Sequence, residues 1–213
     1  MWLAVAAAVL VLAFPPTRHV LGRAARAGIR AVAAARAAEA RERVVARYAH
    51  QYGISRDMAD AIERAARAEE VETELAFRLV RVESAFNPRA LSPVGAVGLT
   101  QLMLPTAREL QPGITRAALY DRDTNLRLGF RYFRQLLRIY RGDEVTALHA
   151  YNRGIGTVAR IRKAGGDPAN GYARKVLGEP GASPVGPVTP DTATTAAPPR
   201  VDELAPVRLP SGR

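Results

Sequence analysis

A single carboxylate interrupts an otherwise apolar helical stripe in the middle of the sequence. Ala76, Leu79 and Val80 stand at positions i, i+3 and i+4 of a predicted helix, and position i+7 of the same stripe is Glu83. Burying an ionised carboxylate costs free energy, so a carboxyl group placed there has a raised pKa and keeps its proton. A carboxyl group protonated near neutral pH can act as a general acid and protonate a leaving oxygen. Glu83 is therefore the candidate catalytic residue.

Two structural explanations of Glu83 compete with this hypothesis. The carboxylate could form an ion pair with a nearby arginine such as Arg81 or Arg89, or it could mark the exposed end of its helix. For an isolated glutamate these explanations come first, because most carboxylates in proteins are solvated or paired. The choice depends on the chain that follows.

The segment after Glu83 has the composition of a cleft wall. The helix is expected to end before Pro88, because a proline disfavours helical backbone in the residue that precedes it. Turn-forming residues follow at 92–98 (SPVGAVG), where two glycines allow the backbone to approach a ligand or a neighbouring helix closely. A short helix is predicted to begin after Gly98 and to carry Gln101.

Four motifs, in this order along the chain, resemble those of soluble-type lytic transglycosylases. They are ESAFNPRA (83–90), SPVGAVGLTQLM (92–103), DTNLRLG (123–129) and AYNRG (150–154). Four ordered motifs are a much more specific signal than any one of them alone. The resemblance covers roughly residues 68–177 and includes neither the N-terminal part nor the C-terminal tail.

The resemblance implies an all-α, lysozyme-like catalytic domain. Members of the family that the chain resembles cleave the β-1,4 bond between N-acetylmuramic acid and N-acetylglucosamine in peptidoglycan and leave a 1,6-anhydro product. One glutamate serves first as the acid and then as the base, and this role falls on Glu83. The resemblance assigns sugar binding to Ser84, Gln101, Tyr151, Asn152 and Tyr172. Tyr151 and Asn152 would also orient Glu83. Structural alternatives remain open for two of them: Tyr151 could be a core tyrosine, and Gln101 could be a buried amide that holds the loop.

The sequence departs from the family's pattern at a few positions. Thr100 stands where the family usually has methionine, and Leu104 precedes a proline that is usually found one place earlier. His149 and Arg153 replace small residues around the AYN motif. These departures concern the preference for particular sugars and leave the acid in place.

The acidic residues near Glu83 are few, since the next one along the chain is Glu109. Most glycosidases use two carboxylates, so a single one favours a transglycosylase over the nearest alternative, a goose-type lysozyme-like hydrolase. A non-catalytic glycan-binding protein would have no use for an acid on the apolar stripe. A nucleic-acid binder would interleave aromatic and basic residues within the domain, which this chain does not. No metal or other cofactor is expected, because the chain has no cysteine and three scattered histidines.

The domain that must position these residues is predicted to be a series of helices. Alanine, leucine and valine must supply the core, because 48% of the residues are hydrophobic but only 6% are aromatic. The predicted helices are a capped one from Ser55 to Ala66, then Glu74 to Ala85, one near Pro105, Asp123 to Tyr140 with Asp123 as cap, Asp143 to about Tyr151-Asn152, and Tyr172 to Leu177. No segment alternates apolar and polar residues for long enough to predict a sheet.

Composition divides the 213 residues into four parts. Residues 1–17 contain the uncharged apolar run Trp2–Phe14, which suits a signal or membrane anchor but is shorter than the ~20 residues that cross a bilayer. Residues 18–52 are a basic linker rich in alanine and arginine, predicted to be one long helix over 20–49. Residues 53–178 form the catalytic domain. Residues 179–213 hold eight of the chain's fifteen prolines and are predicted to be disordered.

The charge of the chain is unevenly distributed. The net charge is +11, and residues 1–50 contain eight arginines against two glutamates. Such a segment favours an anionic membrane surface or the acidic cell wall. The arginines follow the apolar run instead of preceding it, which opposes the usual orientation for an exported domain. We nevertheless expect a monomer in the cell envelope or periplasm that acts on peptidoglycan strands, with tethering by the N-terminus as an extension of this hypothesis.

Overall fold

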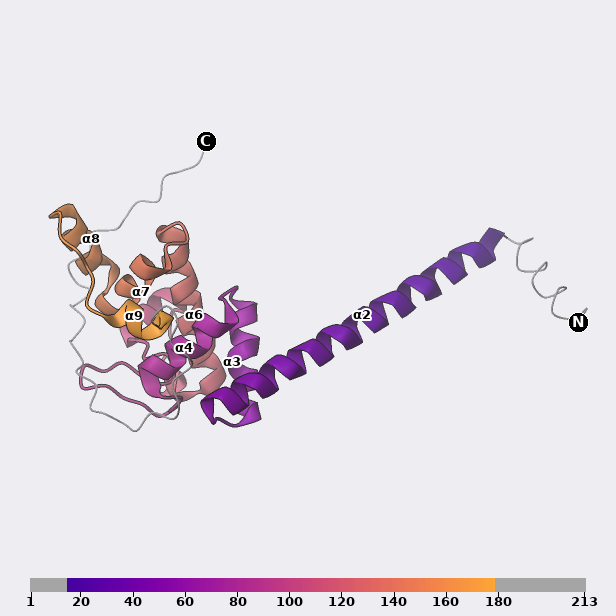
Figure 1. The fold of residues 1–213 in the computed structure, drawn as a ribbon, viewed down its shortest axis with the longest axis horizontal. Helices are drawn as coiled ribbons and strands as arrows, with labels where there is room; N and C mark the ends of the chain where they lie inside the picture. Colours follow the sequence, from indigo (N-terminus) through magenta and orange to yellow (C-terminus); the bar gives the residue numbers. More distant parts are fainter. Residues whose placement is uncertain (1–14, 179–213) are drawn as a thin grey trace, which may run out of the picture. The chain divides into compact units, whose positions relative to one another are not determined.

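The computed structural model describes residues 15–178, with side chains from residue 28, and every regular element in this range is a helix (Figure 1). The elements are α2 (Pro15–Tyr52), α3 (Arg56–Ala68), α4 (Thr73–Ser84), α5 (Leu104–Leu110), the 3-10 helix η1 (Ala117–Tyr120), α6 (Arg122–Ile139), α7 (Glu144–Arg153), α8 (Ile155–Lys163) and α9 (Tyr172–Leu177). The prediction of an all-α protein is confirmed.

The chain divides into two compact units, residues 1–47 and 48–213. The first unit contains most of α2, so the long helix predicted over 20–49 is confirmed. Within the described residues, no helix is both long and apolar enough to cross a membrane. The apolar run Trp2–Phe14 and the proline-rich tail after Gly178 lie outside the described residues. What the sequence predicts for these two segments stays a prediction.

The second unit begins at Tyr48, ahead of the boundary expected at Gly53. The Tyr48 side chain is buried, its ring stacks on Phe77 of α4 with centroids 4.2 Å apart, and its hydroxyl donates to Glu74 at 3.1 Å. Tyr52 extends this stack, with its ring centroid 5.7 Å from that of Phe77. The last turn of α2 therefore supports the helix that carries Glu83.

This packing predicts that a chain beginning at Gly53 is less stable than one beginning at Arg41. Losing two aromatic side chains that stack on a core phenylalanine is expected to lower the free energy of unfolding by at least ~3 kcal/mol. Tyr48→Phe, which removes only the hydroxyl, should cost about 1 kcal/mol. Urea unfolding of the three proteins checks this, and equal unfolding free energies for the two shortened chains would contradict it.

Side chains fix where the helices of the second unit begin. Ser55, Asp121 and Asp143 each accept a hydrogen bond from the backbone N–H three residues later, at 3.1, 2.9 and 3.0 Å. Such caps satisfy N–H groups that have no partner within the helix. Two of these starts are as predicted, but Asp121 caps α6 in place of the expected Asp123. Asp123 instead lies within the first turn and accepts a hydrogen bond from Arg122 at 3.1 Å.

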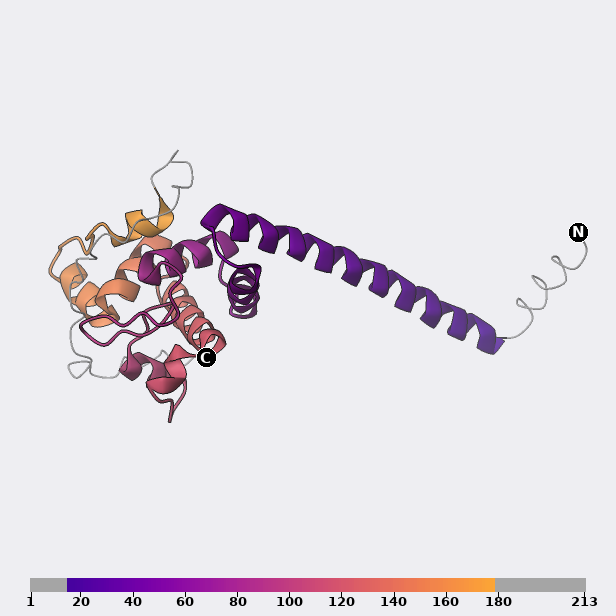
Figure 2. The same cartoon turned by 90° about the horizontal axis from the view of Figure 1, so that it is seen from below.

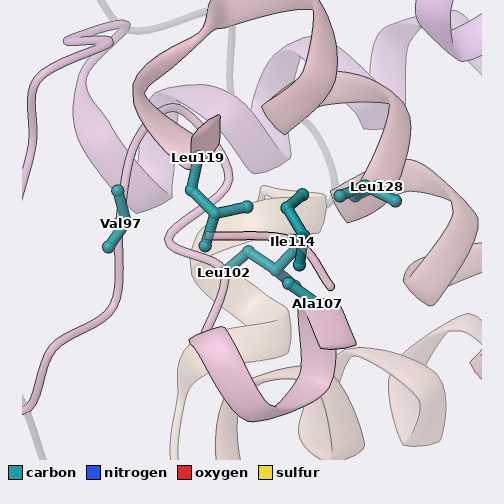
Figure 3. Packing of buried hydrophobic residues seen from close by; sticks show 6 residues of the cluster. All are labelled: Val97, Leu102, Ala107, Ile114, Leu119 and Leu128. Carbon is teal, nitrogen blue, oxygen red and sulfur yellow. The ribbon is translucent and has the colours of Figure 1, made fainter. Parts of the chain in front are cut away.

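Helix α6 is the central element of the second unit, because it packs against α3, α5, η1 and α7. Helix α9 packs against both α4 and α7, and Figure 2 shows the orange α9 alongside the magenta α4. A cluster of buried apolar side chains joins the loop after α4 to α5, η1 and α6 (Figure 3). Its members are Val97, Leu102, Ala107, Ile114, Leu119 and Leu128. The packing of α9 against α4 and α7 brings the end of α4, the end of α7 and the start of α9 together.

The short helix predicted after Gly98 is a turn instead. Val97 and Leu102 exchange both of their backbone hydrogen bonds, each 3.1 Å long. Between them Gln101 has a φ of 46°, in the left-handed region, which a right-handed helix cannot accommodate. Two further elements, η1 and α8, were not predicted from the sequence. The predicted helix near Pro105 is present as the short α5.

Candidate active site

Glu83 lies in the last turn of α4, on the stripe that faces the interior. Leu79 and Val80 of this stripe are fully buried, and Glu83 is partly buried. Removal from water raises the pKa of Glu83 from its ordinary 4.5 to about 7, and a hydrogen bond from Tyr172 opposes this rise. A carboxyl group with this pKa can donate and take up a proton near neutral pH.

The ion-pair explanation of Glu83 does not hold in the described part of the chain. Arg81 lies over the ring of Tyr52, with its guanidinium carbon 6.0 Å from the ring centroid. No charged group is among the causes of the raised pKa of Glu83. The carboxylate instead accepts a hydrogen bond from the hydroxyl of Tyr172.

Tyr172 approaches Glu83 from the start of α9. Its side chain is buried, and it is the first residue of this helix, directly after Gly171. Gly171 has a φ of 82°, a backbone conformation that glycine adopts without strain. Burial is the largest cause that raises the pKa of Tyr172, and the charge of Glu83 adds to it. Tyr172 therefore stays protonated, and its hydroxyl donates a hydrogen bond to Glu83 when that carboxyl group is ionised.

Three of the predicted sugar-binding residues hold the turn after Gly98 through three successive carbonyl groups. Gln101 donates from Nε2 to the carbonyl of Gly98 at 3.0 Å, and Ser84 donates to that of Leu99 at 2.8 Å. Tyr151 donates to the carbonyl of Thr100 at 2.8 Å. The structural alternative for Gln101, an amide that holds the loop, is thus present in the structure. Binding of sugar by these three residues stays a prediction.

The hydroxyl that contacts Glu83 belongs to Tyr172, whereas the resemblance gives the orienting role to Tyr151 and Asn152. Tyr151 is still a neighbour of Glu83, since the charge of Glu83 contributes to its raised pKa after the larger effect of burial. Asn152 accepts a hydrogen bond from Asn170 at 2.7 Å. Its side chain is therefore tied to the segment before α9.

Asn125 is a structural residue of the site that belongs to the DTNLRLG motif but was given no role from the sequence. Its buried side chain accepts from the N–H of Thr100 at 2.9 Å and from the Thr100 hydroxyl at 2.8 Å. It donates to the carbonyls of Val97 and Leu119, both at 2.9 Å. A lone amide at the start of the buried stripe of α6 was the signal that could have identified it.

The glycines of this region are required by close packing. A Cβ atom on Gly98 would lie 2.4 Å from the amide nitrogen of Asn125, and one on Gly129 would lie 2.2 Å from the hydroxyl of Thr100. Thr100, one of the departures from the family's pattern, thus fits into space that Gly129 leaves. Together these residues fix the turn whose carbonyls Gln101, Ser84 and Tyr151 contact.

The sequence and the fold agree with one known family. A family model described as "Transglycosylase SLT domain" matches residues 60–171, which is more than half of the chain. The chain belongs to this family. The match spans α4, the turn after Gly98, α6 and α7, and it ends one residue before Tyr172.

This SLT domain matches only part of the length of its relatives. The chain is 33% identical over 105 residues to the soluble lytic murein transglycosylase of Escherichia coli K12, covering 46% of this chain and 16% of that protein. It is 32% identical over 116 residues to the membrane-bound lytic murein transglycosylase C of Edwardsiella ictaluri, covering 48% of this chain and 32% of that protein. The chain thus spans less than a third of either relative.

A solved structure shares the fold of the SLT domain. It is the complex of the 70-kDa soluble lytic transglycosylase with bulgecin A, with a TM-score of 0.50 and 30% identity, covering 55% of this chain and 22% of that chain. The likeness supports the lysozyme-like helical arrangement that the resemblance implies.

A cavity lies away from this site. It measures about 440 Å³ and is lined by charged side chains, among them Glu72, Arg134 and Arg141, near the start of α4. Glu83 lies at the opposite end of α4, and no predicted site residue lines the cavity.

Among the described residues, no three histidine, cysteine, aspartate or glutamate side chains gather as a metal ion requires. The candidate active site is therefore the group around Glu83 and Tyr172.

Proposed function

We propose that this SLT domain is a peptidoglycan lytic transglycosylase, in which Glu83 acts first as general acid and then as general base. The observation that carries the proposal is the partly buried Glu83, whose pKa burial raises to about 7 and whose carboxylate accepts a hydrogen bond from Tyr172. Membership of the family and the names of its relatives support the choice of substrate. The substrate is the β-1,4 bond between N-acetylmuramic acid and N-acetylglucosamine.

In the first step protonated Glu83 acts as the acid. It donates its proton to the glycosidic oxygen while the bond between that oxygen and the anomeric carbon of N-acetylmuramic acid breaks. N-acetylglucosamine then leaves with a free hydroxyl, and positive charge develops on the anomeric carbon. Glu83 becomes a carboxylate, and the Tyr172 hydroxyl stabilises this form because it donates a hydrogen bond to the charged oxygen.

In the second step the Glu83 carboxylate acts as the base. It takes the proton from the 6-hydroxyl of the same N-acetylmuramic acid, and the oxygen of this hydroxyl bonds to the anomeric carbon. A 1,6-anhydro ring forms, Glu83 is protonated again, and no water is consumed. A pKa near 7 suits a group that must perform both transfers at neutral pH.

A goose-type hydrolase on the same fold is the alternative, since it would begin with the same acid. Such an enzyme needs a group that activates water, and no second carboxylate affects the pKa of Glu83 among the described residues. This favours the intramolecular attack, although both reactions cleave the same bond.

The products separate the two reactions. We expect digestion of purified sacculi to release muropeptides that are lighter by one water than those a muramidase releases from the same sacculi. Mass spectrometry of the two digests measures this difference directly. Products with the mass of hydrolysed ends would assign the hydrolase reaction, and sacculi left intact by the folded protein would overturn the whole proposal.

We also propose that the protein works in the cell envelope, where its substrate lies. Arg30 and Arg36 belong to the basic part of α2, and each basic side chain near anionic lipid contributes about 1 kcal/mol of binding. The expected outcome of cell fractionation is that the full chain, as a monomer, sediments with the envelope, while a chain beginning at Arg41 does so less. Recovery of the full chain in the cytosol would contradict this localisation.

A further inference from the structure

The Tyr172 side chain reaches Glu83 from a short helix that has no side-chain cap of its own. Helix α9 has six residues, and its N-cap is Gly171, which cannot accept a hydrogen bond through a side chain. The direction of Tyr172 therefore depends on the packing of α9 against α4 and α7 and on what holds the segment 164–171, which joins α8 to α9. The residues that do so are not among those the family resemblance assigned.

Asn170 connects the backbone of Tyr172 to α7. Its side-chain oxygen accepts a hydrogen bond from the N–H of Tyr172 at 3.2 Å. Its amide nitrogen donates to the side chain of Asn152 at 2.7 Å. The two ends of one amide thus bridge the start of α9 and the end of α7.

Three residues on one face of α7 lie near this segment, and two of them, Asn152 and Arg153, form hydrogen bonds with it. His149, Asn152 and Arg153 stand at i, i+3 and i+4, so their side chains lie on the same face of the helix. His149 is buried, its Nδ1 atom has no hydrogen-bond partner in the described part of the chain, and Asn170 is among the groups that affect the pKa of its ring. Arg153 donates to the carbonyl of Pro168 at 2.9 Å. Two of the three, His149 and Arg153, are departures from the family's pattern, and here they contact the segment that leads to Tyr172.

We propose that Asn170, held by this face of α7, is the positioning residue that keeps the hydroxyl of Tyr172 on Glu83. The proposal rests on the proposed function in that Glu83 is taken as the acid. Asn170 touches neither Glu83 nor the reacting atoms, so it acts only through Tyr172. Arg153 stands where the family usually has a small side chain, and its guanidinium holds this segment at the carbonyl of Pro168.

The test is a double-mutant cycle read from the pKa of Glu83 by carboxyl-carbon NMR of the full chain without substrate. Tyr172→Phe removes a donor to the carboxylate, so the ionised form loses stabilisation and the pKa of Glu83 rises, by roughly one unit. Asn170→Ala should raise it by a smaller amount. In the Tyr172→Phe background, Asn170→Ala should cause no further change, because the hydroxyl that it positions is gone.

The other groups that face Glu83 do not disturb this measurement. They are Tyr151 on α7 and Tyr172 on α9, and burial raises the pKa of both phenols well above the titration range of Glu83. Burial lowers the pKa of His149, with Asp167, Arg153 and Asp143 as its charged neighbours, and its ring signals are followed separately. Ser55→Ala is the matched control, because it removes another side chain-to-backbone bond at the start of a helix. It should leave the pKa of Glu83 unchanged.

Two outcomes would overturn the proposal. A folded Asn170→Ala protein with the wild-type pKa of Glu83 would show that Asn170 positions nothing at the site. An equal rise in both backgrounds would show that Asn170 acts independently of Tyr172.

If Asn170→Ala does not fold, Arg153→Ala and Arg153→Lys replace it. Lysine can still donate to the Pro168 carbonyl, so Arg153→Lys should restore the pKa that Arg153→Ala raises, and equal values would overturn the role of Arg153.

Failure of this proposal is separate from failure of the proposed function. The NMR measurement needs neither substrate nor turnover, so it reports the position of Tyr172 whatever the reaction is. Cleavage of sacculi that survives in Glu83→Gln would overturn the function and leave the coupling between Asn170 and Tyr172 intact. In turnover assays Asn170→Ala should lower kcat with little change in KM, since the residue acts on the acid and not on substrate binding.

Discussion

Glu83→Gln is expected to remove nearly all cleavage of peptidoglycan while the protein stays folded. An amide cannot donate a proton to the glycosidic oxygen, and a positioned general acid contributes about 10²–10⁴-fold to the rate. Glutamine has the same shape and can still accept the hydrogen bond from Tyr172, so the end of α4 should be undisturbed. Release of soluble muropeptides from sacculi measures the loss. A folded Glu83→Gln protein that clears sacculi at the wild-type rate would overturn the assignment of the acid.

Glu83→Gln is expected to lower activity but to raise the stability of the folded protein at high pH. The gain in stability is the control that the loss of activity does not come from unfolding. The pKa of Glu83 is raised from 4.5 to about 7, so the folded protein holds a proton there that the unfolded chain has already lost. Stability therefore falls as pH rises from about 4.5 to about 7, and the cost is fully present above that window. Because glutamine does not ionise, Glu83→Gln should be more stable than the wild type at pH 8 by about 1–3 kcal/mol, and equally stable or less stable below pH 4. Thermal unfolding at the two pH values checks this.

Asn125→Ala is expected to cause the largest loss of stability of any single substitution considered. The buried amide makes hydrogen bonds with Val97, Thr100 and Leu119 at 2.8–2.9 Å. Alanine would leave the N–H of Thr100 and the carbonyl of Leu119 without these partners, whereas the carbonyl of Val97 would keep its hydrogen bond from Leu102. Each such group costs about 1–3 kcal/mol, so the free energy of unfolding should fall by about 3–5 kcal/mol.

Asn87→Ala is the matched control for this substitution. Asn87 is exposed and its side chain accepts a single hydrogen bond, from the N–H of Arg89 at 2.9 Å, so its loss should cost less than about 1 kcal/mol. Urea unfolding compares the two variants. A loss below about 1 kcal/mol for Asn125→Ala would show that the turn after Gly98 does not depend on this amide. Where the variant remains folded, it should also cleave sacculi more slowly, because the turn contacts Ser84 and Tyr151.

The sequence by itself determined the helical class and the position of Glu83 on the buried side of its helix. The apolar stripe of α4 repeats with the period of the helix, so the spacing alone identifies Glu83 as a carboxylate on the buried side. Local signals also placed most helix starts, because a cap such as Ser55 or Asp143 acts within one turn of the chain. The same locality explains the error at Asp123, since two aspartates two residues apart can both cap and only the packing decides between them.

Only the tertiary structure decided which side chains meet. Tyr172 lies 89 residues beyond Glu83 in sequence, and its hydroxyl reaches the carboxylate because α9 packs on α4 and α7. Nothing in the local sequence distinguishes this hydroxyl from that of Tyr151, which is directed instead to the carbonyl of Thr100. The turn after Gly98 depends likewise on Asn125, an amide 25 residues away from the Thr100 that it contacts. Periodicity reports which face of an element is buried, whereas the partner of a buried polar group is set by the packing of elements distant in the chain.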